Sequence, residues 1–226
     1  MVSSGLLNFS ISKPVFRQYP DVKTTASRLN FTKALDAFRQ FIQQYTALSD
    51  ADWAAIAQCF ERRIIEKDEI LLAEGTICRH LYFLESGLLR YFILKDGNDI
   101  TKFFTEAPYC FTSQVSFTAQ KPAKENIQAI EKSIVWQTTL TKTDELLELK
   151  SWNTFVRKLI QEVQFFTEEI LQEIQTETAE NRYKKMMEVN PAFLQRIPLQ
   201  HLASFFGIAP QSLSRIRKKI AQESRT

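Results

Sequence analysis

The sequence predicts an α+β protein with a β-rich domain, one long helix and a C-terminal helix-turn-helix. Three observations lead to this fold class. Apolar residues recur every second position across residues 63–140, and every third or fourth position before and after that segment. Turn residues such as Asp96 and Gly97 separate the short apolar runs of the middle segment. Near the C-terminus, Gly207 divides two amphipathic stretches, as a glycine that ends a helix does.

The composition is that of a globular protein, with 226 residues of which 44% are hydrophobic and 24% charged. No run approaches the roughly 18 apolar residues of a membrane span, and the first residues lack the pattern of a secretory signal. We therefore expect a soluble, cytoplasmic protein with no membrane partner. Cys59, Cys78 and Cys110 form no CxxC pair, which argues against a disulfide framework or a zinc site. We expect three buried, reduced thiols and no metal site.

Charge is distributed unevenly along the chain. The net charge is +3, but residues 181–226 hold nine lysine and arginine residues against two acidic ones, a net +7, so residues 1–180 carry −4. A basic C-terminal block on an acidic body is typical of nucleic-acid-binding modules. Because basic tails are common, this charge pattern indicates nucleic-acid binding only together with a fold that binds nucleic acids.

The N-terminal part predicts an extension followed by two helices. Residues 1–32 have no steady period and predict a flexible segment. A helical pattern then begins, and Ser49 is the expected N-cap of the second helix. The apolar faces of the two helices are formed by Leu35, Phe38, Phe41, Ile42 and Tyr45, then by Trp53, Ile56 and Phe60.

The middle of the chain predicts an all-β sandwich or barrel. Asp96 and Gly97 stand between two apolar runs, which indicates a hairpin with a type I′ turn, because that turn needs positive φ at both central residues. We expect strands at residues 69–73, 80–85, 88–94, 101–104, 126–131 and 133–138. With the preceding helices they form a domain spanning residues 33–142.

Residues 143–178 predict a long helix with an apolar heptad seam. The seam, spaced 4, 3, 4, 3 and 4, consists of Trp152, Val156, Leu159, Val163, Phe166 and Ile170. A second row holds Phe155, Ile160, Leu171 and Ile174. We interpret the seam as a dimer contact with the same helix of a second copy, and the second row as the cover of the β domain. The alternative is a helix that packs only on its own β domain.

Residues 179–226 contain the most specific pattern. A short helix is expected from Pro198 to residue 208, with Gly207 at its end, and a second helix begins at Pro210. Ala203 is the small residue where the two helices cross. In a helix-turn-helix the second helix enters the major groove of DNA. The apolar residues that pack the pair are Leu202, Phe205, Phe206, Leu213, Ile216 and Ile220.

Polar and basic residues form the opposite face of the second helix. Arg215 is our candidate for reading a guanine edge, and Gln211 suits an adenine edge. Lysine and serine side chains suit phosphates. The full set of predicted DNA contacts is Gln200, Gln211, Ser212, Arg215, Arg217, Lys218 and Lys219. The alternative is that this basic face is only a solvated surface.

These features resemble the Crp/Fnr family of bacterial transcription regulators. The resemblance is carried by IPLQHLASFFGIAPQSLSRIRKK (197–219), AENRY (179–183), LYFLESG (81–87), NIQAIE (126–131), Glu74 with Gly75, and Asp96 with Gly97. It implies a jelly-roll-like double-stranded β-helix as sensor domain, a dimerisation helix and a winged helix-turn-helix. It also implies a homodimer on a two-fold-related DNA site, with Gln211 and Arg215 at base-contacting positions. Pro210 falls where cyclic-AMP-responsive members place an arginine, and little chain follows Lys219 to form a wing.

The effector signature departs from that family. Cyclic-nucleotide binders hold the ribose with a glutamate and the phosphate with an arginine, within the segment that matches FTSQVSFTAQKPAK (111–124). Here Ser113 stands near the glutamate, and Ala123 or Lys124 near the arginine. Tight cyclic AMP binding is therefore not expected, and three scattered cysteines do not suit an iron–sulfur cluster. The candidate effector pocket is Thr112, Ser113, Gln114, Ala123 and Lys124.

The function we expect is sequence-specific transcription regulation by a homodimer that binds double-stranded DNA. RNA polymerase and an unidentified small effector are candidate partners. The alternative is a β-roll signalling or scaffold module that binds a protein and has only non-specific affinity for DNA. No motif of hydrolase, kinase or dinucleotide-binding sites occurs, so we expect no enzymatic activity and assign no catalytic residue.

Overall fold

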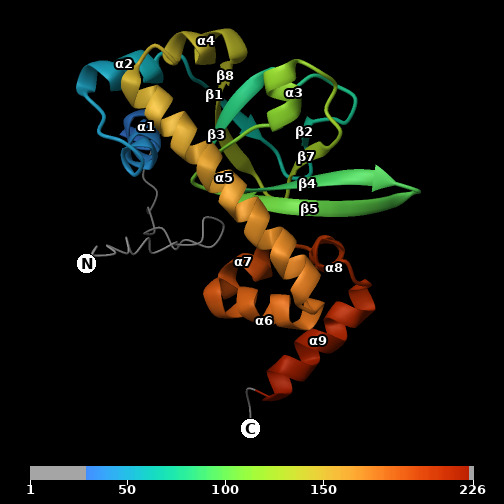
Figure 1. The fold of residues 1–226 in the computed structure, drawn as a ribbon. Coiled ribbons are helices and arrows are strands. Elements are labelled where there is room, and N and C mark those ends of the chain that lie inside the picture. Colours follow the sequence, from blue (N-terminus) through green and yellow to red (C-terminus); the bar gives the residue numbers. More distant parts are fainter. Residues whose placement is uncertain (1–28, 224–226) are drawn as a thin grey trace, which may run out of the picture.

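The computed structural model describes residues 29–223 (Figure 1). Two helices, α1 (Leu29–Gln43) and α2 (Asp50–Ala57), precede a β-roll of two four-stranded antiparallel sheets. The strands are β1 (Glu61–Ile65), β2 (Ile70–Leu72), β3 (His80–Ser86), β4 (Leu88–Lys95), β5 (Asn98–Glu106), β6 (Tyr109–Phe111), β7 (Asn126–Ala129) and β8 (Ser133–Thr139). One sheet has the order β1-β8-β3-β6 and the other β2-β7-β4-β5.

The remaining elements are helices. A short helix α3 (Gln114–Ala119) interrupts the strands, and α4 (Leu140–Leu146) leads to the long helix α5 (Lys150–Thr176). The C-terminal helices are α6 (Ala179–Val189), α7 (Pro191–Arg196), α8 (Leu199–Phe206) and α9 (Pro210–Glu223). Helix α5 runs from the end of the molecule that holds α2 and α4, along the β-roll, to these C-terminal helices (Figure 1).

The predicted hairpin is confirmed. Strands β4 and β5 pair from Leu88 with Glu106 to Lys95 with Asn98. The two residues between them, Asp96 and Gly97, have φ angles of +52° and +77°. Positive φ at both positions matches a type I′ turn, which follows the right-handed twist of the strands.

A second hydrophobic core lies outside the β-roll, between its β1-β8-β3-β6 sheet, the N-terminal helices and the start of α5. Phe38 of α1 stacks on Phe83 of β3 with ring centroids 4.4 Å apart. Trp152 of α5 is 0% exposed, and its ring lies 6.0 Å from Phe60 and 5.2 Å from Phe155. The first turns of α5 are therefore fixed to the same chain's own sensor domain.

This core corrects the predicted dimer seam. Trp152 and Leu159 are buried within their own chain and cannot reach a second copy. Phe155 of the second row is also buried, whereas Ile160, Leu171 and Ile174 of that row are 48–56% exposed. The heptad spacing correctly predicts a helix with apolar rows. The row predicted to meet a second copy is the more buried one, and the row predicted to cover the β domain is the more exposed one.

Several element bounds also differ from the predictions. The helix predicted over 143–178 is divided into α4 and α5 by residues 147–149, and α1 begins at Leu29 rather than near residue 33. Residues 1–28 of the predicted extension lie outside the described residues. Strands β1 and β6 and helix α3 were not predicted, because their segments are short and lack a clear period. Ser49 caps α2 as predicted, accepting from Asp52 N at 3.0 Å, but the helix ends before Phe60.

Helices α6–α9 pack around a third core that includes Tyr183, Phe193, Leu202, Phe206 and Leu213. Within residues 179–223 the structure has helices only, so the β-wing implied by the resemblance is not found there.

Trp152→Ala should lower the free energy of unfolding by about 3–5 kcal/mol, the usual cost of truncating a buried aromatic residue. The indole N–H has no acceptor among the described residues, so packing alone accounts for the contribution. Trp152→Phe is the matched control and should retain most of the stability. Urea unfolding at several protein concentrations measures both variants. A loss for Trp152→Ala that disappears at high concentration would place Trp152 at a dimer contact instead.

Candidate nucleic-acid interface

Helix α8, a short turn and helix α9 occupy the segment for which a helix-turn-helix is predicted. Gly207 has φ +70°, and its N–H donates to the carbonyls of Ala203 and Ser204, which ends α8. Pro198 is the N-cap, so α8 begins at Leu199, one residue later than predicted. Leu213 and Ile220 of α9 are buried with Ala203 in the third core. The apolar stripe of α9 therefore faces α6 and α8, which directs its polar face to solvent.

Most basic residues of the C-terminal helices already have partners. Lys184 pairs with Glu180 at 3.1 Å, Lys185 with Glu177 at 3.0 Å, and Lys219 with Glu180 at 2.8 Å. Arg215, Arg217 and Lys218 form no ion pair with any residue in the described part of the chain, and all three are exposed. The positive charge that is free to meet an anion is thus concentrated on one helix, α9.

The residues of the predicted DNA contacts lie on that helix with one exception, Gln200. Gln211 and Arg215 are exposed and four residues apart, so they lie on the same face of α9, and Lys218 follows one turn later. Gln200 is exposed but belongs to α8, and Ser212 is half-buried. Lys219 remains exposed, although its ion pair with Glu180 directs it toward α6.

Helix α8 is held against the β-roll by Ser204. Its hydroxyl accepts from the backbone N–H of Thr101 at 2.9 Å and donates to the carbonyl of Asp99 at 2.8 Å. Both partners belong to the β5 strand. The ring of Phe205 lies 5.5 Å from that of Phe104, on the same strand. Helix α8 therefore packs against β5, the edge strand of one sheet of the β-roll.

Helix α7 adds an ionic contact between the two parts. Arg196 donates to both oxygens of Glu131, at 2.6 and 3.2 Å, and also pairs with Glu106. Asn190 donates to Glu106 at 3.2 Å. Burial raises the pKa of the Glu106 carboxyl, and the Arg196 guanidinium opposes that rise. These residues escaped sequence reasoning because the partners stand 65 and 90 positions apart and share no motif.

His201 of α8 is half-buried near an ion pair of the β-roll. Arg90, only 3% exposed, donates to both carboxylate oxygens of Asp99 at 2.6 and 2.7 Å. Burial lowers the pKa of His201, and the positive charge of Arg90 lowers it further. The imidazole is therefore held neutral where α8 meets the sensor domain.

The two segments of the predicted effector pocket meet where Ser113 contacts Glu125, but the side chains of the set differ in exposure. Ser113 is buried and donates to Glu125 at 2.6 Å, while Thr112 donates to the carbonyl of His80 at 2.9 Å. Ala123 is buried, but Gln114 and Lys124 are exposed. Lys124 therefore does not supply a cation to the interior. Glu125, which the sequence did not single out, takes the place beside Ser113 and pairs with Lys102 at 3.5 Å.

Aromatic side chains fill much of the β-roll interior. Tyr82 stacks on Phe111 with centroids 5.0 Å apart, and Tyr91 stacks on Phe103 at 4.0 Å. Burial raises the pKa of Tyr91 far above its usual range, so its hydroxyl stays neutral. An interior of this kind favours apolar contacts and offers no free cation for a cyclic phosphate among the residues described here.

The three cysteines are free thiols. Cys78 and Cys110 are buried as expected, and burial raises the pKa of Cys110, but Cys59 is half-buried. In the described residues no three histidine, cysteine or acidic side chains lie close enough to share a metal ion. Over the same residues, no helix is both long and apolar enough to cross a bilayer.

Comparison with known proteins identifies the β-roll. Residues 62–149 match the cyclic nucleotide-binding domain. No curated protein sequence matches the chain significantly.

Solved structures with similar folds cover most of the chain. A variant of CooA from Carboxydothermus hydrogenoformans is 14% identical, with a TM-score of 0.60 over 80% of this chain and 83% of its own. FixK2 from Bradyrhizobium japonicum is 16% identical, with a TM-score of 0.60 over 73% and 86%. The c-di-GMP responsive global regulator CLP from Xanthomonas campestris is 11% identical, with a TM-score of 0.62 over 78% and 93%. At these identities the likeness establishes the fold alone: a β-roll, a long helix and C-terminal helices.

The stability of the protein should fall as the pH drops from about 7 to about 5. Because burial lowers the pKa of His201 below 6.5 in the folded state, unfolding takes up a proton in this range, and the unfolded state gains from acidification. His201→Gln should lose less stability over the same range, measured by urea unfolding at each pH. His80→Gln should also lose less stability, because burial lowers the pKa of that histidine as well. An equal loss in His201→Gln and the parent would show that His201 titrates normally.

Proposed function

We propose that this chain is a sequence-specific DNA-binding transcription regulator of the Crp/Fnr type that acts as a homodimer. The observation that carries the proposal is the exposed face of α9, where Gln211 and three cations without an ion pair in the described part of the chain follow the α8–turn–α9 arrangement. The fold shared with global regulator CLP supports it.

In this proposal α9 lies in the major groove of DNA. Arg215 donates two parallel hydrogen bonds to a guanine, and Gln211 pairs with an adenine edge. Arg217, Lys218, Lys219 and Ser212 contact phosphates, and Gln200 of α8 reaches the backbone beside the groove. Lys219 has to exchange its bond with Glu180 for a phosphate, so its net contribution is the smallest of the lysines and arginines.

The dimer in this proposal forms through the second half of α5. Ile160, Val163, Leu171 and Ile174 are 43–56% exposed, and Thr167 completes a stripe with spacings of 3, 4, 4 and 3. Two such stripes pair as in a coiled coil and place two copies of α9 about 34 Å apart, one turn of DNA. Phe166 and Ile170, which the sequence also assigned to this contact, border the stripe on the side toward the C-terminal helices.

The sensor domain in this proposal does not bind cyclic AMP tightly, because Ser113 and the exposed Lys124 do not replace a ribose carboxylate and a phosphate guanidinium. RNA polymerase and a small effector remain proposed partners, and no catalytic step is part of the proposal.

The second candidate function is a β-roll module that binds a protein and attaches to DNA only non-specifically. The filled interior of the β-roll favours it, and sequence-blind DNA binding would establish it.

Selection of random DNA by the purified chain tests the function. We expect a two-fold-symmetric motif with half-sites about one turn apart. Arg215→Ala should lose about 1–3 kcal/mol of binding free energy at one base pair of each half-site and relax the sequence preference there.

Lys218→Ala should weaken binding to all DNA sequences alike and reduce the salt dependence of the DNA affinity. Arg79→Ala, an exposed β-roll arginine, is the control. Unaltered preference in Arg215→Ala would assign base reading to another residue.

Ile160→Glu should convert the dimer to a monomer, weakening self-association by at least about 100-fold, because it places two unpaired carboxylates in an apolar contact. Gln172→Glu, an exposed position away from the stripe, is the matched control and should remain dimeric. Analytical ultracentrifugation of the full chain measures both. A dimer that survives Ile160→Glu would place the interface elsewhere on the molecule.

A further inference from the structure

One side of the second half of α5 carries two adjacent aromatic residues among glutamates. Phe165 is 56% exposed, and Phe166 next to it is half-buried. Phe165 lies about 140° around the helix from Ile160, so this side is distinct from the stripe proposed for the dimer. We call it the aromatic–acidic face, and it consists of Glu162, Phe165, Phe166, Glu169 and Glu173.

The charge of this face is not balanced by the residues around it. Residues 160–176 include four glutamates and no lysine or arginine. Glu173 pairs with Lys185 of α6 at 3.7 Å. Glu162 and Glu169 form no ion pair with any residue from 29 to 223. A face with an exposed aromatic ring and uncompensated carboxylates suits a partner that is both basic and apolar.

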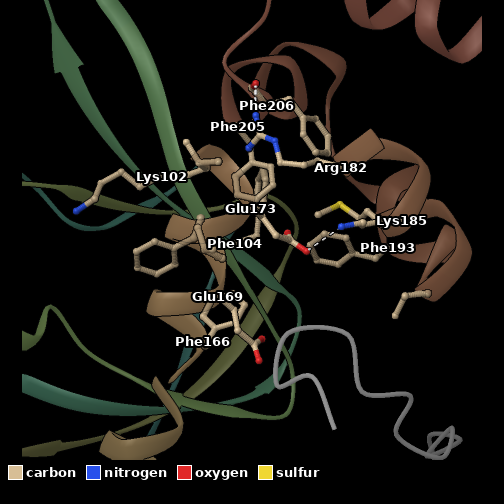
Figure 2. A pocket seen from close by; sticks show the side chains of 15 residues that line it. Lys102, Phe104, Phe166, Glu169, Glu173, Arg182, Lys185, Phe193, Phe205 and Phe206 are labelled. Atoms are coloured by element: carbon tan, nitrogen blue, oxygen red, sulfur yellow. Dashed lines mark hydrogen bonds and ion pairs between the residues drawn. The ribbon is translucent and has the colours of Figure 1, made fainter. Parts of the chain in front are cut away.

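The aromatic–acidic face borders the junction where α5, strand β5 and the C-terminal helices meet (Figure 2). Phe166 and Glu169 line the mostly apolar cavity at this junction together with Phe193 of α7. Figure 2 shows the Phe166 ring and the Glu169 carboxylate at the end of this cavity that is remote from Arg182. A partner bound along the face therefore reaches from the sensor domain to the C-terminal helices.

Residues 1–28, which precede α1 in the sequence, have the composition that this face requires. Their charged residues are Lys13, Arg17, Lys23 and Arg28 against Asp21 alone. Their apolar residues include Leu6, Leu7, Phe9, Ile11, Val15, Phe16 and Tyr19. A second copy of the same face is a poorer partner, because a two-fold contact of the face with itself places glutamates opposite glutamates.

Helix α1, which follows this segment, packs on the same side of α5 (Figure 1). The Tyr45 carbonyl, in the turn after α1, accepts from the Lys158 Nζ at 2.5 Å, and the Phe41 ring lies 6.0 Å from that of Phe155. Lys158 precedes Phe165 by about two helical turns, so both lie on one side of α5. Helix α1 is about 22 Å long, and residues 1–28 can span up to about 90 Å, so they reach the face from either end of α1.

We propose that residues 1–28 bind the aromatic–acidic face of α5 in their own chain. Their lysine and arginine side chains pair with Glu162 and Glu169, and their apolar side chains cover Phe165. Burial of the exposed ring supplies most of the free energy, because exposed ion pairs contribute little individually. The bound segment connects α1 to the C-terminal helices at the junction. This interaction goes beyond the proposed function and does not depend on DNA binding.

Limited trypsin digestion of the full chain measures how well the segment is bound, by the initial rate of cleavage after Arg17 and Lys23. Phe165→Ser should raise this rate at least about tenfold, because the segment loses an apolar contact and the cleavage rate follows the unbound fraction. Leu94→Ser, at another exposed apolar position, is the matched control and should leave the rate unchanged.

Glu169→Lys tests the ionic part of the contact in the same digestion. It should raise the cleavage rate about threefold, since it replaces an exposed ion pair by a repulsion. Glu148→Lys makes the same change of charge at an exposed position outside the face and should have no effect. Thermal melting verifies that each variant is folded.

Carbodiimide cross-linking, which joins lysine amines to carboxylates in direct contact, locates the segment. An equal mixture of unlabelled and isotope-labelled full chains is cross-linked, digested and analysed by mass spectrometry. We expect Lys13 or Lys23 to be linked to Glu162 or Glu169, with both peptides of each link from one kind of chain.

Links between labelled and unlabelled chains overturn the proposal, because a second copy then supplies the segment. Absence of any link from the two lysines to the face, or a trypsin rate that Phe165→Ser leaves unchanged, also overturns it. A loss of self-association in Phe165→Ser overturns it too, since the face then belongs to a contact between copies. None of these results depends on whether the chain recovers a DNA motif, so the two proposals fail independently.

Discussion

The placement of the C-terminal helices against the β-roll depends on the contact of Arg196 with Glu131 and Glu106. Helix α5 ends at Thr176, and only a short segment joins it to α6, so the chain connection alone does not fix the C-terminal helices. Arg196 closes a bidentate pair with Glu131 across 65 positions of sequence. The side chains of Arg196 and Glu131 are 32% and 37% exposed, so this contact stabilises the arrangement through its bidentate geometry rather than through full burial. Ser204 adds two hydrogen bonds to β5, so the docked arrangement has both ionic and backbone partners.

Helix α5 serves two packing environments in succession. Its first turns contribute Trp152 and Phe155 to a core inside their own chain, and its later turns expose Ile160 and Leu171. The first half is thereby a rigid part of the sensor domain. A partner helix that pairs along the second half meets a surface whose orientation the sensor domain already determines. Any change in the β-roll that moves Trp152 also moves the proposed dimer seam, and with it the spacing of the two α9 helices.

The features predicted correctly from sequence have local causes. Asp96 and Gly97 specify a turn by their own φ preferences, and Gly207 with Pro210 separates two helices for the same kind of reason. Heptad spacing predicts the long helix, but it does not predict which of its apolar rows is buried. The row that contains Trp152 is covered by the N-terminal helices, which lie about 100 positions earlier in the sequence. The contacts between the β-roll and the C-terminal helices, and the hydrogen bond of Ser113 to Glu125, arise from tertiary packing, so no local sequence pattern predicts them. The short strands β1 and β6 are also stabilised mainly by their neighbours in the sheet.

The two interiors of this protein differ in what they can recognise. In the β-roll, Tyr82, Tyr91 and Phe111 pack against one another, and Ser113 donates to Glu125, but the Oε1 of Gln137, the register partner of Tyr82, is buried without a donor among the described residues. At the junction below it, an apolar wall surrounds a guanidinium whose Nε has no acceptor in the described chain. A site must offer unsatisfied groups to gain free energy from a ligand, since a group that is already paired has to exchange one partner for another. Unsatisfied buried groups occur in both interiors, acceptors in the β-roll and a donor at the junction, so the two interiors differ in the kind of partner that their buried polar groups lack.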